Sequence, residues 1–228
     1  SSVSRTFSGG SRSRNERILP LIGKNLSANE LLSEALNDLR CIEWGSITKA
    51  LMRGAISGAD AVDISALYKL SRPLYPGETI DFFMSHSWHD DAEAKFQKLE
   101  LVAETFYSKY QRYPTFWLDK VCIDQDRIAD CLKVLPVNVM ACSKVLVLLG
   151  DSYAHRLWCV WELFILFSFA HEDQAAERAV LLPLHDDRDL LEELESFDAA
   201  DAHCYDPNQE AILWLVIKGV SIERFNQR

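Results

Sequence analysis

The chain has 228 residues, 48% of them hydrophobic, and a formal net charge of −10. This length is enough for one domain with an extension or for two small domains, and the apolar content is enough for a sizeable core. The charge is concentrated in the segment 171–210, where thirteen acidic residues are opposed by Arg178 and Arg188, a local charge of −11. We interpret this run as a solvated helical face, and because the remainder is close to neutral we expect no nucleic-acid partner.

Six cysteines lie at positions 41, 122, 131, 142, 159 and 204, and none forms a C-x-x-C pair. This spacing argues against a zinc ribbon or a thioredoxin-type site, and several of the cysteines lie in apolar runs. We therefore expect a reducing, cytoplasmic environment. The sequence has no signal-peptide pattern and no apolar run long enough to cross a bilayer, so no membrane contact is expected within these residues. Because the chain does not begin with Met, we expect it to be a piece of a longer protein.

The first residues are rich in Ser, Arg and Gly, and we expect 1–16 to be a disordered tail. Ser27 followed by Glu30 is a capping box. Apolar residues then recur at helical spacing over 32–39, which predicts a helix that ends at Gly45.

Two further helices are predicted before the pattern changes, one at 46–55 and a short one at 64–70. Pro73 and Gly77 then break the helical pattern. The sequence thus predicts a helical extension over 17–77, ahead of a separate domain over 78–228.

From residue 78 onward, short apolar runs alternate with longer helical patterns. Strands are expected at 80–84, 115–118, 144–149, 179–184 and, as a short fifth, 203–205. The helices are expected to start at about 91, 126, 157 and 212. Such alternation predicts an α/β domain with a flavodoxin-like, doubly wound parallel sheet in which the strand 80–84 is central.

The segment 157–170 is apolar or aromatic except for Ser168 and one ionisable residue, Glu162. A helix that is apolar all round is buried, and a carboxylate in it must be paired, hydrogen-bonded or protonated. Two interpretations stay open. Glu162 is either a structural group that holds a loop through backbone N–H groups, or a reactive carboxylate at the rim of a pocket.

In the doubly wound strand order, ligands bind where the order reverses, between the first and third strands in the sequence. The segment 85–88 follows the first strand, and Trp158 and Glu162 follow the third. These stretches are therefore predicted to converge on one crevice.

The residues of these loops do not favour metal-binding, phosphate-loop or thiol chemistry. His86, His89, Asp90 and Asp91 have no metal-ligand spacing, and the two aspartates are expected to cap the following helix. There is no Gly-rich phosphate loop. Cys159 is expected to be an inert buried thiol, so neither a metal nor a bound cofactor is predicted.

Three motifs in order resemble the Toll/interleukin-1 receptor (TIR) domain family over about 78–228. DFFMSHS at 81–87 resembles the first strand of that family, and FWLDK at 116–120 resembles the second strand and the start of the BB loop. The third match is the strand 144–150 followed by Ser152-Tyr153, Trp158-Cys159 and Glu162-Leu163, which resembles the family pattern of a strand and then S-x-x-Y/W-C-x-x-E-L. There are departures, because the first loop reads SHSW where many members have Arg or Gly, and the BB loop lacks its usual Gly. The stretch 117–125 also resembles fungal heterokaryon-incompatibility domains.

The resemblance implies an NAD+ glycohydrolase, with NAD+ as substrate rather than cofactor. Glu162 falls on the catalytic position of the NAD-cleaving members. The substrate-binding residues implied are Ser85, His86, Ser87, Trp88, Asp119, Lys120 and Trp158. The products would be nicotinamide and either ADP-ribose or a cyclic isomer, in immune or cell-death signalling that depends on self-association through TIR–TIR contacts. The alternative is a non-catalytic TIR-like module that signals by self-association. Both tryptophans of the last motif, Trp158 and Trp161, are equally compatible with a plain core position.

Overall fold

The computed structural model describes residues 38–54, 64–124, 128–169, 172–185 and 201–204, with isolated positions 33, 36, 198, 207, 210, 211, 213 and 214. The chain divides into two compact units, Ser1–Glu34 and Ala35–Arg228, and the fold described is that of the second. The predicted tail 1–16, the capping box at Ser27 and most of the predicted last helix lie outside the described residues.

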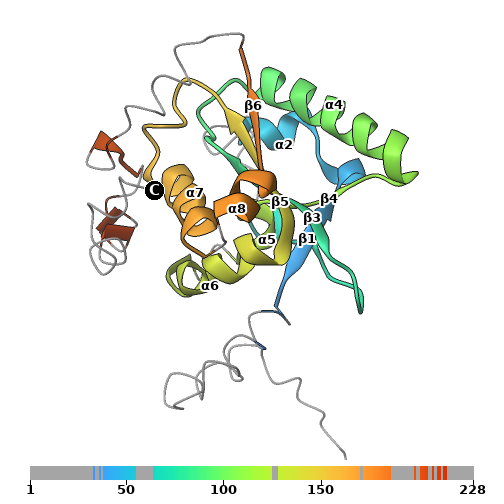
Figure 1. The fold of residues 1–228 in the computed structure, drawn as a ribbon, viewed down its shortest axis with the longest axis horizontal. Helices are drawn as coiled ribbons and strands as arrows, with labels where there is room; N and C mark the ends of the chain where they lie inside the picture. Colours follow the sequence, from blue (N-terminus) through green and yellow to red (C-terminus); the bar gives the residue numbers. More distant parts are fainter. Residues whose placement is uncertain are drawn as a thin grey trace, which may run out of the picture. The chain divides into compact units, whose positions relative to one another are not determined.

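A six-stranded mixed sheet forms the centre of the second unit, in the order β2-β1-β4-β3-β5-β6 (Figure 1). The strands are β1 (Arg40–Glu43), β2 (Arg72–Pro73), β3 (Ile80–His86), β4 (Thr115–Trp117), β5 (Cys142–Leu149) and β6 (Ala179–Pro183). Strands β4, β3, β5 and β6 are parallel to their neighbours in this group, whereas β1 runs antiparallel to both β4 and β2. The four parallel strands follow the flavodoxin-like order, so the predicted fold class and the central place of the first predicted strand are confirmed.

The two central strands are buried on both faces, as their continuous apolar sequences predict. All seven residues of β3 are buried. Alternate residues of β5 face opposite layers: Val145 and Val147 belong to one apolar cluster, and Leu146 and Leu148 to the other. The sheet therefore has a core on each side.

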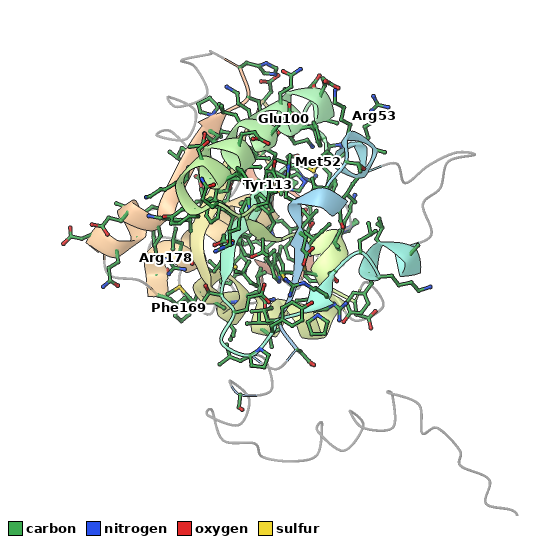
Figure 2. The ribbon with its side chains drawn as sticks, turned by 90° about the vertical axis from the view of Figure 1, so that its right-hand side faces the viewer. Met52, Arg53, Glu100, Tyr113, Phe169 and Arg178 are labelled. Carbon is green, nitrogen blue, oxygen red and sulfur yellow. The ribbon has the colours of Figure 1, made fainter. Side chains whose placement is uncertain are left out.

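Helices cover both faces of the sheet. They are α2 (Lys49–Arg53), α3 (Ile64–Tyr68), α4 (Ala92–Tyr110), α5 (Asp119–Cys122), α6 (Ile128–Ala141), α7 (Leu157–Phe169) and α8 (Glu172–Arg178), with a 3-10 turn at Trp44–Ser46. Figure 1 shows α2 and α4 on one side and α6, α7 and α8 on the other. In Figure 2 the labelled Met52 of α2, which is fully buried, lies beside the α4 helix that carries Glu100.

Helix α4 follows its prediction closely. The Asp91 side chain accepts a hydrogen bond from the Ala94 N–H at 2.7 Å and caps the first turn. The helix ends at Gln111, which has the left-handed φ of 56°, three residues before Pro114. The predicted apolar face differs at its end, where Tyr110 is 51% exposed.

The segment before Gly77 is not wholly helical, and that prediction is wrong at two places. The predicted first helix is replaced over Arg40–Glu43 by strand β1, and a second short strand, β2, lies at Arg72–Pro73. Ile42 of β1 pairs with Phe116 of β4 and is fully buried. Pairing with β4 and β2 thus outweighs the local helical preference.

Two further differences concern the second half of the chain. The predicted fifth strand is an isolated bridge between His203 and Arg156, just before α7, instead of a strand of the main sheet. The prediction did not separate α8 from the helix before it. Within the described part of the chain, every helix is too short or too polar to cross a membrane.

Candidate functional site

The carboxyl ends of the parallel strands bring three polar segments together. The segment 85–91 ends β3 and leads into α4, Asp119 and Lys120 follow β4, and the segment 150–156 joins β5 to α7. Because parallel strands end at the same edge of a sheet, these loops meet there. The convergence predicted for the loops after the first and third predicted strands is therefore found.

Glu162 is enclosed at this edge. It lies in α7, its side chain is 5% exposed, and the Ser85 hydroxyl of β3 donates a hydrogen bond to Oε2 at 2.5 Å. Burial raises the pKa of the Glu162 carboxyl well above its usual range; the Ser85 hydrogen bond opposes this shift, and the charge of Asp119 adds to it. The enclosure therefore favours the protonated carboxyl, whereas a cationic neighbour or a more open site would favour the carboxylate.

Tyr153 completes the same cluster and was not among the predicted site residues. Its Oη lies 2.7 Å from Ser85 Oγ and 3.4 Å from the Cys159 carbonyl oxygen, and its ring is fully buried. Its place in the loop that follows the buried strand β5 is the signal in the sequence that could have indicated it. Three oxygen atoms from β3, α7 and the β5–α7 loop thus form one hydrogen-bond chain.

A second cluster fastens the loop after β3 to the loop after β5. The Ser152 N–H and Oγ–H both have Asp90 Oδ1 within bonding distance, at 2.9 and 2.7 Å, and Ser152 Oγ also lies 2.7 Å from Ser87 Oγ. A Cβ at Gly150 would meet the Asp90 carboxyl carbon at 2.5 Å. The prediction that both aspartates cap α4 is thus right for Asp91 and wrong for Asp90, which instead binds Ser152 in the loop after β5.

Trp88 organises a third cluster. Its indole N–H donates to Asp119 Oδ2 at 3.1 Å, Lys120 Nζ lies 3.8 Å from the ring centroid, and the His86 ring meets it edge-on at 4.3 Å. A Cβ at Gly54, which ends α2 with a φ of 57°, would meet the Trp88 ring at 2.8 Å and Lys120 Nζ at 2.9 Å. The end of α2 therefore packs directly on this cluster.

Two lysines bring ammonium groups to this edge, where the carboxylates of Asp90 and Asp119 act on them. Lys95 of α4 is fully buried and donates from Nζ to the Ser87 carbonyl oxygen at 2.8 Å, and burial lowers its pKa to about 8. Burial likewise lowers the pKa of Lys120. Burial, with a contribution from both ammonium groups, holds the pKa of His86 well below its usual range, so the imidazole is neutral. Lys95 was missed by the sequence analysis, although it lies one turn before Leu99 on the predicted apolar face.

Three buried side-chain atoms in the described part of the chain have no hydrogen-bond partner: His86 Nε2, Asp90 Oδ2 and Lys120 Nζ. All three belong to the loops at this one edge of the sheet. Buried polar groups are almost always satisfied, so unsatisfied ones gathered in one place point to a polar ligand or to water.

The predicted site residues thus fall into two linked groups. Ser85 joins Glu162, whereas His86, Asp119 and Lys120 surround Trp88, with Ser87 between the groups. Trp158 is half-buried and packs against the apolar cluster of α6 and α7. Trp161 is 4% exposed and stacks on Phe164 at 5.4 Å, as expected for a core residue.

The site offers acid–base and electrostatic chemistry. Burial raises the pKa of the Cys159 thiol well above its usual range, so this sulfur is a poor nucleophile. No three potential metal ligands cluster within the described ranges. What remains are the Glu162 carboxyl in its chain of hydroxyl groups and, in the second and third clusters, the carboxylates of Asp90 and Asp119, two ammonium groups and an indole ring. The sequence matches no model of a known protein family and no curated protein.

Proposed function

We propose that the chain is an NAD+ glycohydrolase of the TIR type, which cleaves the bond between nicotinamide and ribose with Glu162 as its catalytic residue. The observation that carries the proposal is the gathering of unsatisfied buried polar atoms at the sheet edge that holds Glu162. Ligands of open α/β sheets bind at this edge. The order of the TIR-like motifs along the chain supports the same assignment.

The chemistry needs one carboxylate. The bond between ribose C1′ and the ring nitrogen breaks, its electron pair stays on nitrogen, and nicotinamide departs neutral. The ribose becomes an oxocarbenium ion, which an ionised Glu162 stabilises. Water then adds at C1′ and releases a proton, giving ADP-ribose, whereas capture by a nitrogen of the adenine base gives a cyclic isomer.

The charge of the substrate fits the state of the site. Burial favours the protonated form of Glu162, but the cationic nicotinamide ring favours the carboxylate when it approaches, because a nearby opposite charge lowers the pKa. Lys120 and His86 supply polar contacts for the pyrophosphate, and Trp88 or Trp158 supplies an aromatic face for a base. Because Glu162 is 5% exposed, substrate entry requires the surrounding loops to separate.

A second candidate is a non-catalytic module that signals by self-association. The enclosure of Glu162 by Ser85 is also what a structural carboxyl would have. Apolar side chains are exposed on and just after α4, namely Leu101 at 63%, Tyr110 at 51% and Tyr113 at 44%, and each is available for contact between copies.

The Glu162→Gln variant separates the two functions, because it keeps the shape of the side chain and removes the charge. Under the enzymatic proposal, its melting temperature stays near that of the parent and nicotinamide release falls by about 10²–10³-fold. Glu104→Gln, which changes an exposed carboxylate of α4, is the matched control and should leave both measurements unchanged.

Two results would contradict the enzymatic proposal. One is a parent protein that releases no nicotinamide from NAD+ at any protein concentration, tested up to crowded conditions that favour association. The other is a Glu162→Gln variant that melts normally and cleaves NAD+ at the parent rate. A variant that unfolds, beside an inactive parent that self-associates in light scattering, supports the signalling module.

A further inference from the structure

The buried chain of hydroxyl groups ending at Glu162 contains a residue with no role in the cleavage described above. Tyr153 Oη lies 2.7 Å from Ser85 Oγ, which lies 2.5 Å from Glu162 Oε2. Ser85 and Tyr153 are fully buried and Glu162 nearly so, so bulk water does not compete for these bonds. We propose that Tyr153 is a positioning residue, which acts through the Ser85 hydroxyl to fix the direction of the chain and thereby the charge state of Glu162.

Each hydroxyl group has one hydrogen to donate, and this limits the directions that the chain of hydrogen bonds can take. When Glu162 is ionised, Ser85 donates to Oε2, and Tyr153 can then donate to Ser85 Oγ. When Glu162 is protonated, its own O–H can donate to Ser85, Ser85 to Tyr153, and Tyr153 to the Cys159 carbonyl oxygen at 3.4 Å. Both states are satisfied because two acceptors lie within reach of the Tyr153 hydroxyl, Ser85 Oγ and the Cys159 carbonyl oxygen.

The two directions are not equivalent in strength. Hydrogen bonds that end on a carboxylate are stronger than neutral ones, and a second donor behind Ser85 strengthens the first. The Tyr153–Cys159 bond of the neutral state is the longest in the chain, at 3.4 Å. The phenol hydroxyl therefore stabilises the ionised carboxylate more than the protonated carboxyl.

Two other titratable groups face Glu162, Asp119 from α5 and Cys159 from the preceding turn of α7. The Asp119 charge and burial both raise the pKa of Glu162, whereas the Ser85 hydrogen bond lowers it. Ser85 and the phenol behind it are thus the groups in this set that favour ionisation.

The test is Tyr153→Phe, which removes the hydroxyl and keeps the ring. The side-chain carboxyl of Glu162 is followed by ¹³C NMR in ligand-free protein labelled at Glu, with the signal assigned by its loss in Glu162→Gln. We expect the midpoint of the Glu162 titration to rise by about 0.5–1 pH unit. Tyr113→Phe is the matched control, because that phenol also donates to a glutamate, Glu104 at 3.0 Å, but at the surface.

Two further variants test the route through Ser85 and guard against misfolding. The Ser85→Ala/Tyr153→Phe double variant should shift the Glu162 titration no further than Ser85→Ala alone. Replacing Tyr153 by 3-fluorotyrosine keeps the shape and makes the phenol a stronger donor, so the midpoint should fall. Unchanged midpoints in Tyr153→Phe and in the fluorinated protein, or additive shifts in the double variant, overturn the proposal.

The catalytic consequence rests on the proposed function, whereas the effect on the carboxyl does not. If NAD+ is the substrate, the acid limb of the pH profile for nicotinamide release moves in Tyr153→Phe by the same amount as the NMR midpoint. A shifted midpoint in a protein that releases no nicotinamide rejects the enzymatic function and keeps the role of Tyr153. A parent that releases nicotinamide, together with a Tyr153→Phe variant whose Glu162 midpoint is unshifted, keeps the enzymatic function and rejects the role of Tyr153.

Discussion

Gly150 is the position where a single methyl group should disturb the site most directly. A Cβ added there would lie 2.5 Å from the Asp90 carboxyl carbon and 2.6 Å from Asp90 Oδ2. Its φ is not in the left-handed region, so Gly150→Ala strains no backbone dihedral and acts through this collision alone. The carboxylate must move, and it then loses the bonds from the Ser152 N–H and Oγ–H at 2.9 and 2.7 Å.

The magnitude follows from those two bonds. Hydrogen bonds to charged groups contribute about 1.5–3 kcal/mol each, and Asp90 is half-exposed, so water replaces part of the loss. We expect Gly150→Ala to lower the free energy of unfolding by about 2–3 kcal/mol in urea denaturation at pH 7. Gly45→Ala is the control, because nothing lies within 4 Å of a Cβ added there, and it should change stability by less than about 0.5 kcal/mol.

A double-mutant cycle identifies the cause. Asp90→Ala removes the two nearest colliding atoms together with the hydrogen bonds, leaving only the 2.9 Å approach of the Asp90 Cβ. In that background, Gly150→Ala should cost much less than in the parent, so the two effects are not additive. Additive effects, or a Gly150→Ala protein as stable as the parent, would refute the reasoning.

Two predictions concern pH. Burial holds the pKa of His86 below 6.5, so the unfolded chain takes up a proton before the folded protein does as pH falls. In urea titrations below pH 6.5, the free energy of unfolding of the parent should therefore fall by up to about 1.4 kcal/mol per pH unit. The His86→Gln variant should lack this loss. Lys95 has a pKa of about 8 in the folded protein and 10.5 in the unfolded chain, so between these pH values the unfolded chain binds more protons. The free energy of unfolding of the parent should therefore rise between pH 8 and 10.5, relative to that of Lys95→Met, by up to about 1.4 kcal/mol per pH unit. Parallel pH–stability curves of parent and variant would contradict either prediction.

The elements that the sequence predicts well are those whose signal is local and continuous. Strand β3 is apolar over most of its length and α7 is apolar around Glu162, so burial on all sides could be inferred for both. β1 has four residues with a charge at each end, and its pairing with β4 lies more than 70 positions away in the chain. No local pattern carries that information.

The candidate site divides in the same way. Glu162 and Ser85 could be paired from the sequence because the strand order places their elements side by side. The roles of Tyr153 and Lys95 could not be predicted from the sequence, because they depend on how far each side chain reaches. The Tyr153 hydroxyl bonds to Ser85, and the Lys95 ammonium group lies near the Trp88 ring and donates to the Ser87 carbonyl oxygen. Asp90 likewise binds Ser152 instead of capping α4, and this could not be predicted because Ser152 is remote in sequence.

The segment before Gly77, which the sequence separates from the α/β domain, is part of the site by its contacts. β1 adds an antiparallel strand to β4, whose chain continues directly into Asp119 and Lys120. Gly54 ends α2 against Trp88 and Lys120 Nζ, where no larger residue fits without displacing them. The end of α2 therefore covers Lys120 Nζ, one of the three unsatisfied atoms, and α2 is itself held through Met52 in the same core as α4. Under the proposed function, a ligand that reaches Lys120 Nζ has to displace the end of α2 or the Trp88 indole.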